Sequence, residues 1–376
     1  MKFLDLKKEH EHYDWKEVLT PVFENVSFIN GPQVAQFEEE FASYCGTGYA
    51  VGVGSGTNAL EVALLTLGIN CSTQPVVLTS PYTFIATTEI PHRLGARVIF
   101  CDIKEDFNID IEQVKEIISS RKVNIFIPVH LFGKPVSLDK ELIDLCNEKG
   151  VVIIEDAAQA TGTRFISNEK SGMEHVGSFG DIGCFSFFPA KNLGCAGDGG
   201  AVIMKDWRLY EKAKMIRNHG SKSKNKYWNK MHGGNFRLDS IQAAILSAKL
   251  KHIGKLLKSR ANTAKVYNEQ LKYLQEDLVL PFTCNTENHT YNQFVMRIKN
   301  GRRDALKDHL KQLDIPTVIY YPKCLSEQPC YTGMDFENNC PNSKQAASDN
   351  LALPIAYLSE EERSRVIDGI KNFYNR

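Results

Sequence analysis

A lysine inside an apolar stretch is the residue of this sequence with the clearest chemical potential. Lys191 follows two phenylalanines, a proline and an alanine, and a glycine-rich run occupies residues 194–200. Most lysines are solvated surface residues, but apolar surroundings disfavour the charged form, which lowers the pKa and leaves neutral amine for nucleophilic attack. The glycines permit close approach of the backbone to a flat ligand. We therefore predict that Lys191 forms a Schiff base with a carbonyl compound.

Two acids follow a buried-strand pattern. The run 151–154 (Val-Val-Ile-Ile) leads directly into Glu155 and Asp156, then into small residues and Gln159. An acid at this position is costly to bury without a cation, a metal or hydrogen-bond donors. Asp156 could cap a following helix. The functional interpretation is that it holds a proton on a buried nitrogen cation, with Gln159 on the same side.

A third segment has the features of an anion site. Residues 54–60 (Gly-Ser-Gly-Thr-Asn-Ala-Leu) follow a strand pattern and open a helix pattern. Backbone N–H groups at the positive end of a helix attract anions, and the hydroxyl of Thr57 adds a donor beside Gly56. An ordinary helix cap after a glycine turn explains the segment equally well. It is not a Walker loop, because no Gly-Lys-Ser/Thr follows.

Alternating apolar strands and helices would position these residues. Short β-branched runs separated by helices are typical of a parallel sheet that is covered on both faces. Ligands bind beyond the carboxyl ends of such strands, so functional residues should lie just after these runs, as Glu155 and Asp156 do. The predicted strands are residues 50–53, 76–78, 98–101, 125–129 and 151–154, and the helices are residues 57–67, 111–118 and 138–149, the last ended by Gly150.

The pattern changes after Asp239. Two long helices are predicted at residues 242–257 and 260–274, followed by a strand at 291–298 and a helix at 303–313. We place a domain boundary near residue 245, which gives a large domain of residues 1–245 and a small one of residues 246–376. The lysine-rich segment 222–226 is interpreted as a solvated loop.

Composition narrows the function classes. The 376 residues carry 45 basic and 45 acidic side chains, so the formal net charge is zero and a broad surface for nucleic acid is not expected. No apolar run is long enough for a signal sequence or a spanning helix, so we expect a cytoplasmic protein that is not bound to a membrane. The ten cysteines are scattered without CxxC spacing and are interpreted as reduced thiols, with no metal site.

Together these segments resemble the DegT/StrS family of nucleotide-sugar aminotransferases, which are fold-type-I enzymes that use pyridoxal 5'-phosphate (PLP). The resemblance runs almost end to end, and the order and spacing of the motifs carry it. The matching segments are 28–32, 56–60, 83–84, 95–96, 128–133, 155–159, 186–191, 217–220, 235–239, 242–246, 321–322 and 328–329.

The resemblance implies a fold and a set of roles. The fold would be a large α/β domain with a mostly parallel seven-stranded sheet between helices, plus a smaller C-terminal α/β domain. Lys191 would bind PLP covalently and move protons, and Asp156 would pair with the ring nitrogen. Gly56, Thr57 and Ser186 would bind the phosphate, and Gln159 would bind the phenolic oxygen. Phe84 would stack on the ring, with core packing as the alternative. Asn235 would reach the phosphate of the cofactor in a neighbouring subunit.

The same resemblance implies amine transfer from an amino acid, glutamate by family habit, to a nucleotide-linked keto-sugar. Substrate contacts are predicted at Arg237, Tyr320 and Tyr321, in a homodimer with shared active sites. Segments such as 235–239 and 320–322 look more like members that act on 3-keto sugars than on 4-keto sugars. Those members often have Ser in place of Phe236 and His in place of Tyr320, so the hexose stays open.

Three alternatives remain. The first is amination of a 4-keto sugar. The second is another fold-type-I enzyme, such as a lyase or a cysteine desulfurase, for which Cys195 near Lys191 would be the cysteine to examine. The third is a non-catalytic regulator built on the same fold, which is expected to have lost Lys191 or Asp156; both are present.

Overall fold

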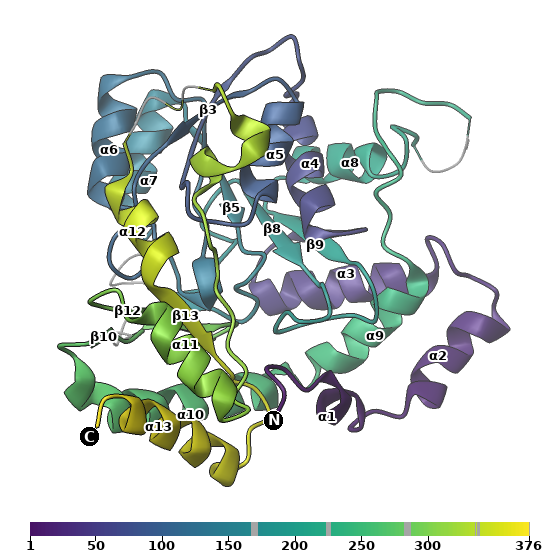
Figure 1. Ribbon diagram of the computed structural model, residues 1–376. Coiled ribbons are helices and arrows are strands. Elements are labelled where there is room, and N and C mark those ends of the chain that lie inside the picture. The colour runs from purple at the N-terminus through teal and green to yellow at the C-terminus, as the bar shows by residue number, and fades with distance from the viewer. Residues whose placement is uncertain (167–171, 223–226, 282–286, 335, 337–338, 376) are drawn as a thin grey trace.

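A seven-stranded sheet forms the centre of the protein (Figure 1), as the resemblance implied. The computed structural model describes residues 1–166, 172–222, 227–281, 287–334, 336 and 339–375. Every strand of the sheet is parallel except β9, which is antiparallel to both of its neighbours. The spatial order is β1 (Tyr49–Val53), β9 (Gly200–Met204), β8 (Ile182–Ser186), β5 (Val152–Asp156), β4 (Ile125–Ile127), β2 (Val76–Thr79) and β3 (Arg97–Phe100).

Helices cover both faces of this sheet because successive strand residues point to opposite sides. In β8, Phe185 packs toward one helix layer, whereas Ile182 and Cys184 pack toward the other. One layer contains α3 (Pro32–Cys45), α9 (Ser240–Leu250), α6 (Ile111–Ser120) and α7 (Lys140–Lys149). The opposite layer contains α4 (Gly56–Thr66), α5 (Ala86–Arg93) and α8 (Trp207–Ile216).

The C-terminal part of the chain forms a second core beside the first (Figure 1). Its three-stranded antiparallel sheet has the order β10 (Leu278–Val279), β12 (Phe294–Ile298) and β13 (Asn350–Leu353). Its helices are α10 (Ile253–Leu271), α11 (Arg303–Gln312), α12 (Pro341–Asp349) and α13 (Glu360–Phe373), with short 3-10 turns η2 (Lys272–Leu274), η3 (Leu325–Glu327) and η4 (Pro329–Tyr331).

Smaller elements connect these two parts. The N-terminal helices are α1 (Leu6–His10) and α2 (Trp15–Glu24), and the 3-10 turn η1 (Leu131–Gly133) follows β4. A minor sheet pairs β6 (Arg164–Phe165) with β7 (Glu174–His175) and with β11 (Glu287–Asn288).

Local capping explains where the helix predicted at 138–149 begins and ends. The side chain of Asp139 accepts a hydrogen bond from the backbone N–H of Leu142, at 2.8 Å, at the start of α7. Gly150 ends the same helix in the left-handed conformation, with φ of 67°, as predicted. The predicted strands of the large sheet and the helices at 57–67 and 111–118 are also found, with ends shifted by a few residues.

Two expectations differ from the structure. The helix predicted at 242–257 is interrupted, because the backbone turns at His252, whose N–H bonds to Lys249 O at 3.0 Å, and α10 then continues to Leu271. The strand predicted from Tyr291 begins at Phe294, because Tyr291 has a φ of 47°, which a strand does not adopt. The predicted solvated loop at 222–226 lies, apart from Lys222, outside the described residues.

Two kinds of feature are missing from the described part of the chain. No helix in it is both long and apolar enough to cross a membrane. Nor does it contain a group of three or more His, Cys, Asp or Glu side chains arranged to hold a metal ion.

Candidate active site

A cavity of about 420 Å³ lies beyond the carboxyl ends of β5 and β8. Its volume is within the range of roughly 300–1,000 Å³ that is typical of small-molecule sites. Segments from both parts of the chain line it, since Asn292, Gln293 and Tyr320 come from beyond α10. The predicted site residues in its wall are Gly56, Thr57, Phe84, Asp156, Gln159, Ser186, Lys191, Tyr320 and Tyr321.

Lys191 lies in a tight loop that follows β8. Its backbone N–H bonds to Phe188 O at 2.8 Å, and a Cβ on Gly194 would lie 2.4 Å from Pro189 O, so the loop can close only with glycine there. Burial lowers the pKa of Lys191 from 10.5 to about 8, and the charge of Asp156 opposes this shift. The structure therefore provides an amine with a substantial neutral fraction near neutral pH.

Asp156 ends β5 and is buried, with 5% of its surface exposed. Its carboxylate accepts hydrogen bonds from the hydroxyl of Thr87 at 2.8 Å and from the N–H of Ala158 at 3.1 Å. Burial raises the pKa of Asp156, while these bonds and the charge of Lys191 act in the opposite direction. A buried carboxylate is costly unless a positive charge lies beside it. A cation in the cavity next to Asp156 would offset this cost and would therefore be bound favourably.

The N-terminus of α4 meets the end of β8 in a narrow cradle. Ser55 caps the helix by accepting a bond from the N–H of Asn58 at 3.0 Å. A Cβ on Gly56 would lie 2.6 Å from the Cβ of Ser186, so only glycine permits this approach. Positive helix ends with backbone N–H groups bind phosphate, and Thr57 and Ser186 add hydroxyls to the same wall.

The amide of Gln159 is oriented by two bonds. Its Oε1 accepts from the N–H of Phe132 at 2.8 Å, and its Nε2 donates to the hydroxyl of Tyr321 at 3.0 Å. Phe84 lies in the cavity wall with 55% of its surface exposed, and therefore does not pack in a core in this chain. Its position is compatible with stacking against a flat ring.

Glu155, the neighbour of Asp156, has a different role. Its carboxylate is fully buried and accepts bonds from the N–H groups of Gly177, Phe179 and Gly180 at 2.6–2.8 Å. The ring Nδ1 of His130 accepts from a backbone N–H at 3.0 Å, so its Nε2 carries the hydrogen that is donated to Glu155 at 2.9 Å. Glu155 thus holds the loop that leads into β8, whereas Asp156 faces the cavity.

Two predicted site residues lie outside this cavity. Asn235 is exposed and forms an isolated backbone bridge with Asn218. Arg237 donates to the side chain of Asn218 at 2.8 Å, and its Nε is buried without a hydrogen-bond partner among the described residues. Neither residue lines the wall that contains Lys191.

Residues that the sequence interpretation missed also contribute to the wall. Thr87 donates to Asp156, and its position three residues after Phe84 in the chain was the available signal. Phe188, 52% exposed, and Asp198 flank Lys191 in sequence. Asn292 and Gln293 line the cavity from the C-terminal part, and no nearby motif indicated them.

The site fits PLP on the chain's own geometry. The glycine cradle suits a phosphate, the buried carboxylate suits a protonated ring nitrogen, and the Lys191 amine suits an aldehyde. Gln159 adds an amide donor, and Phe84 adds an aromatic face. These groups share one wall, so a single flat phosphorylated ring can contact them together.

Comparison with known proteins gives matches over nearly the whole chain. The family model described as the DegT/DnrJ/EryC1/StrS aminotransferase family matches residues 10–371. The chain is 38% identical to a UDP-N-acetyl-3-dehydro-alpha-D-glucosamine 3-aminotransferase of Acidithiobacillus ferrooxidans, covering 94% of this chain and 93% of that one. It is 35% identical to a dTDP-3-amino-3,4,6-trideoxy-alpha-D-glucose transaminase of Streptomyces venezuelae (100% and 96% covered). It is also 36% identical to a "pleiotropic regulatory protein" of Geobacillus stearothermophilus (99% and 98% covered).

Solved structures agree with these matches. A DegT DnrJ EryC1 StrS aminotransferase from Brucella abortus superposes with a TM-score of 0.92 at 32% identity, with both chains fully covered. A Bacillus subtilis protein with bound pyridoxamine phosphate superposes with a TM-score of 0.87 at 26% identity, covering 100% of this chain and 85% of that one. The fold is therefore that of PLP-dependent aminotransferases.

Proposed function

Because the chain belongs to the DegT/DnrJ/EryC1/StrS aminotransferase family, we propose that it transfers an amino group from an amino acid to a nucleotide-linked keto-hexose. The expected donor is L-glutamate. The observation that carries this proposal is the placement of Lys191 and Asp156 in one cavity, beside the cradle formed by Gly56 and Ser186.

The family uses PLP, which supplies an electron-withdrawing ring that stabilises negative charge at the reacting carbon. In this chain Lys191 would hold the cofactor and carry the proton between substrate atoms, since its lowered pKa makes both protonation states accessible. Asp156 would keep a proton on the ring nitrogen. Gln159 would donate to the phenolic oxygen, and the end of α4 would bind the phosphate.

A 3-keto sugar is the acceptor that the relatives favour. The names of the two transaminase relatives both place the amino group at carbon 3 of a nucleotide-linked sugar. The segments at 235–239 and 320–322 gave the same preference. Amination of a 4-keto sugar remains the second candidate. Tyr320 lies in the cavity wall where members that act on 3-keto sugars often have histidine, so this position could change which sugar is accepted.

Two other function classes receive less support. A desulfurase needs a reactive thiolate, but Cys195 is fully buried and burial raises its pKa to about 11. One relative is named as a regulatory protein, yet this chain retains both Lys191 and Asp156 in a ligand-sized cavity. Retention of the amine opposite the acid favours catalysis.

We further propose a cytoplasmic homodimer with shared active sites, which takes part in amino-sugar biosynthesis for a surface polysaccharide such as lipopolysaccharide, or for another glycan. Asn235 is exposed and outside the chain's own cavity, which is where a residue that serves a neighbouring subunit must lie. Phe84 and Phe188 are each more than half exposed in the single chain, and a second subunit would cover them.

The division near residue 245 stays a prediction. This point falls within α9, and Leu246, Leu250 and Ile253 pack in the same cluster as α3. The core of the C-terminal part includes residues from Ala264 onward. We propose that α10 links the two domains.

The decisive experiment is incubation with glutamate and a panel of nucleotide-linked 3-keto and 4-keto sugars, with products identified by mass spectrometry and NMR. We expect yellow purified protein and amination of a 3-keto sugar. Lys191→Ala should abolish transfer while circular dichroism stays unchanged. Turnover by Lys191→Ala at the wild-type rate, or a colourless protein that PLP does not restore, would refute the proposal.

A further inference from the structure

We propose that Tyr321 is a positioning residue that fixes the side-chain amide of Gln159, and that Tyr82 and Asn350 hold Tyr321 in place. The inference rests on the proposed function, because it concerns how the chain presents Gln159 to the phenolic oxygen of PLP. It assigns Tyr321 a role different from the substrate contact expected above.

The first step is the orientation of the amide. The amide of Gln159 has Oε1 accepting from the N–H of Phe132 and Nε2 donating to the hydroxyl of Tyr321. The Phe132 N–H sets which end is the oxygen, because a flipped amide would place an NH₂ group against this donor, and the bond to Tyr321 holds the nitrogen end in place. An amide Nε2 has two hydrogens, so one remains for a ligand. Burial raises the pKa of Tyr321 well above its ordinary value, so the phenol stays neutral at every relevant pH.

The second step is the restraint of the segment that carries this phenol. Tyr82 donates its hydroxyl hydrogen to Tyr320 O at 2.6 Å and accepts from the N–H of Tyr321 at 3.0 Å. Asn350 accepts from the N–H of Tyr320 at 2.7 Å and donates to Tyr321 O at 3.2 Å. Two buried side chains therefore bind all four backbone polar atoms of residues 320 and 321.

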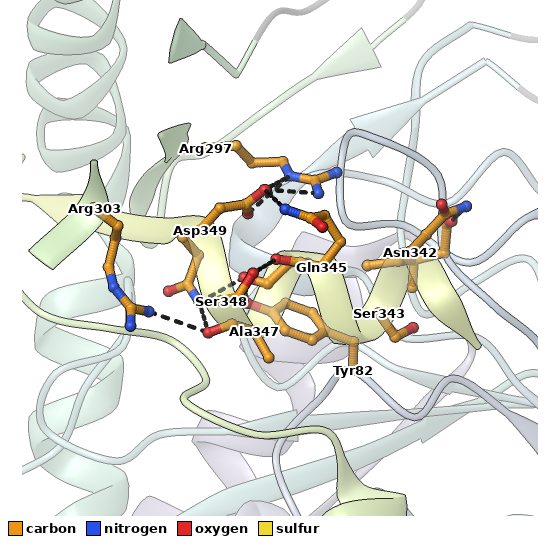
Figure 2. Close-up of polar contacts among 12 residues, drawn as sticks. Tyr82, Arg297, Arg303, Asn342, Ser343, Gln345, Ala347, Ser348 and Asp349 are labelled. Carbon is orange, nitrogen blue, oxygen red and sulfur yellow. Dashed lines mark hydrogen bonds and ion pairs between the residues drawn. The ribbon is translucent and has the colours of Figure 1, made fainter. Parts of the chain in front are cut away.

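The third step is the anchoring of these two side chains. Asn350 begins β13 and also donates to Ala346 O at 2.8 Å, at the end of α12. Its neighbour Asp349 is paired with Arg297 through bonds of 2.9–3.2 Å, and Figure 2 shows this pair with Tyr82 beside α12. Tyr82 is 1% exposed and follows β2 of the large sheet. The restraint thus connects the C-terminal sheet to the cofactor side of the large sheet.

The consequence is a specific loss when the phenol oxygen is removed. Tyr321→Phe keeps the ring but leaves Nε2 without its second acceptor, so the amide can rotate away from the cofactor. A hydrogen bond to the anionic form of an oxygen favours that form. Weakening of the bond from Gln159 to the phenolic oxygen should shift the absorbance titration of bound PLP toward higher pH. It should also weaken PLP binding roughly 3- to 10-fold.

The test compares wild type, Tyr321→Phe, Gln159→Ala and the double variant. Two quantities are measured: the dissociation constant of PLP from the apoprotein, and the pH midpoint of the absorbance of bound PLP. We expect both to change in Tyr321→Phe, and neither to change further when Tyr321→Phe is added to Gln159→Ala. Tyr82→Phe, which loosens the restraint without touching the cavity amide, should give a smaller shift in the same direction.

Tyr267→Phe is the matched control, because Tyr267 is also buried and also loses one bond, to Pro354 O at 3.0 Å in the C-terminal core. It should lower the melting temperature without moving the pH midpoint. A wild-type midpoint and affinity in Tyr321→Phe, with only KM for the sugar changed, would overturn the inference in favour of a substrate contact. A shift that persists undiminished beside Gln159→Ala would overturn it in favour of direct contact with the cofactor. Failure of wild type to bind PLP would instead refute the proposed function.

Discussion

Replacing Asp156 by asparagine should make the amine of Lys191 more reactive in the cofactor-free protein. The charge of Asp156 favours the protonated form of Lys191 and so opposes the lowering of its pKa by burial. An asparagine side chain at this position would have nearly the same size but no charge, so the pKa of Lys191 should fall below the wild-type value. Loss of a catalytic group normally lowers reactivity, whereas this substitution should raise the reactivity of the Lys191 amine.

The wild-type amine sets the scale of this effect. With a pKa of about 8 in place of 10.5, about one quarter of the Lys191 amine is neutral at pH 7.5, against roughly one in a thousand for an ordinary exposed lysine. At equal intrinsic nucleophilicity, Lys191 should therefore react about 200-fold faster than a lysine in a short peptide under the same conditions.

The assay is labelling of apoprotein with an amine-directed reagent between pH 6 and 10, with modification at Lys191 quantified by mass spectrometry. A small reagent is needed so that the cavity admits it, and the lysine peptide is the external reference. We expect a wild-type midpoint near 8 and a lower midpoint for Asp156→Asn. A wild-type midpoint equal to that of the peptide, or an upward shift in the variant, would show that the burial argument is wrong.

Three further predictions concern the surrounding structure. Gly56→Ala should raise the dissociation constant of PLP at least about tenfold in equilibrium dialysis, because the new Cβ would lie 2.6 Å from that of Ser186. Gly254→Ala is the control and should leave the constant unchanged, because its Cβ would meet no described atom within 4 Å outside its own stretch of α10. Asn235→Ala should weaken PLP retention if active sites are shared; unchanged retention removes that part of the proposal. Glu155→Gln should lower the free energy of unfolding by about 2–4 kcal/mol in urea denaturation, because an NH₂ group would face backbone N–H donors, and no change would contradict the structural role given to this carboxylate.

The sequence was sufficient for the parts of the site that follow from strand endings. Asp156 stands directly after the strand predicted at 151–154, and ligands bind at this end of parallel strands. Lys191 was singled out by its apolar neighbours, since no strand was predicted before it. Gly56 was recognisable because a glycine turn opened a helix. These predictions depend on local pattern and on the general geometry of parallel sheets.

The rest depends on contacts between distant segments. Nothing in the local sequence connects Tyr82 with Tyr321, which are 239 positions apart, or indicates that Asn350 binds backbone atoms of the same two residues, 320 and 321. The turn at His252 contains neither glycine nor proline, so the helix pattern runs through it. Neither β8 nor β9 was among the predicted strands, and the antiparallel direction of β9 depends on a chain reversal that periodicity does not encode.

Adjacent carboxylates on β5 also affect how variants of this protein should be interpreted. Loss of Asp156 would remove a partner of the ligand, whereas loss of Glu155 would release a loop of residues 177–180 on which β8 depends. Both changes would abolish product formation in a screen that measures activity alone. Only soluble yield and melting behaviour would separate an inactive but folded protein from one that never reached its native state, so neighbouring positions with identical scores need not share a cause.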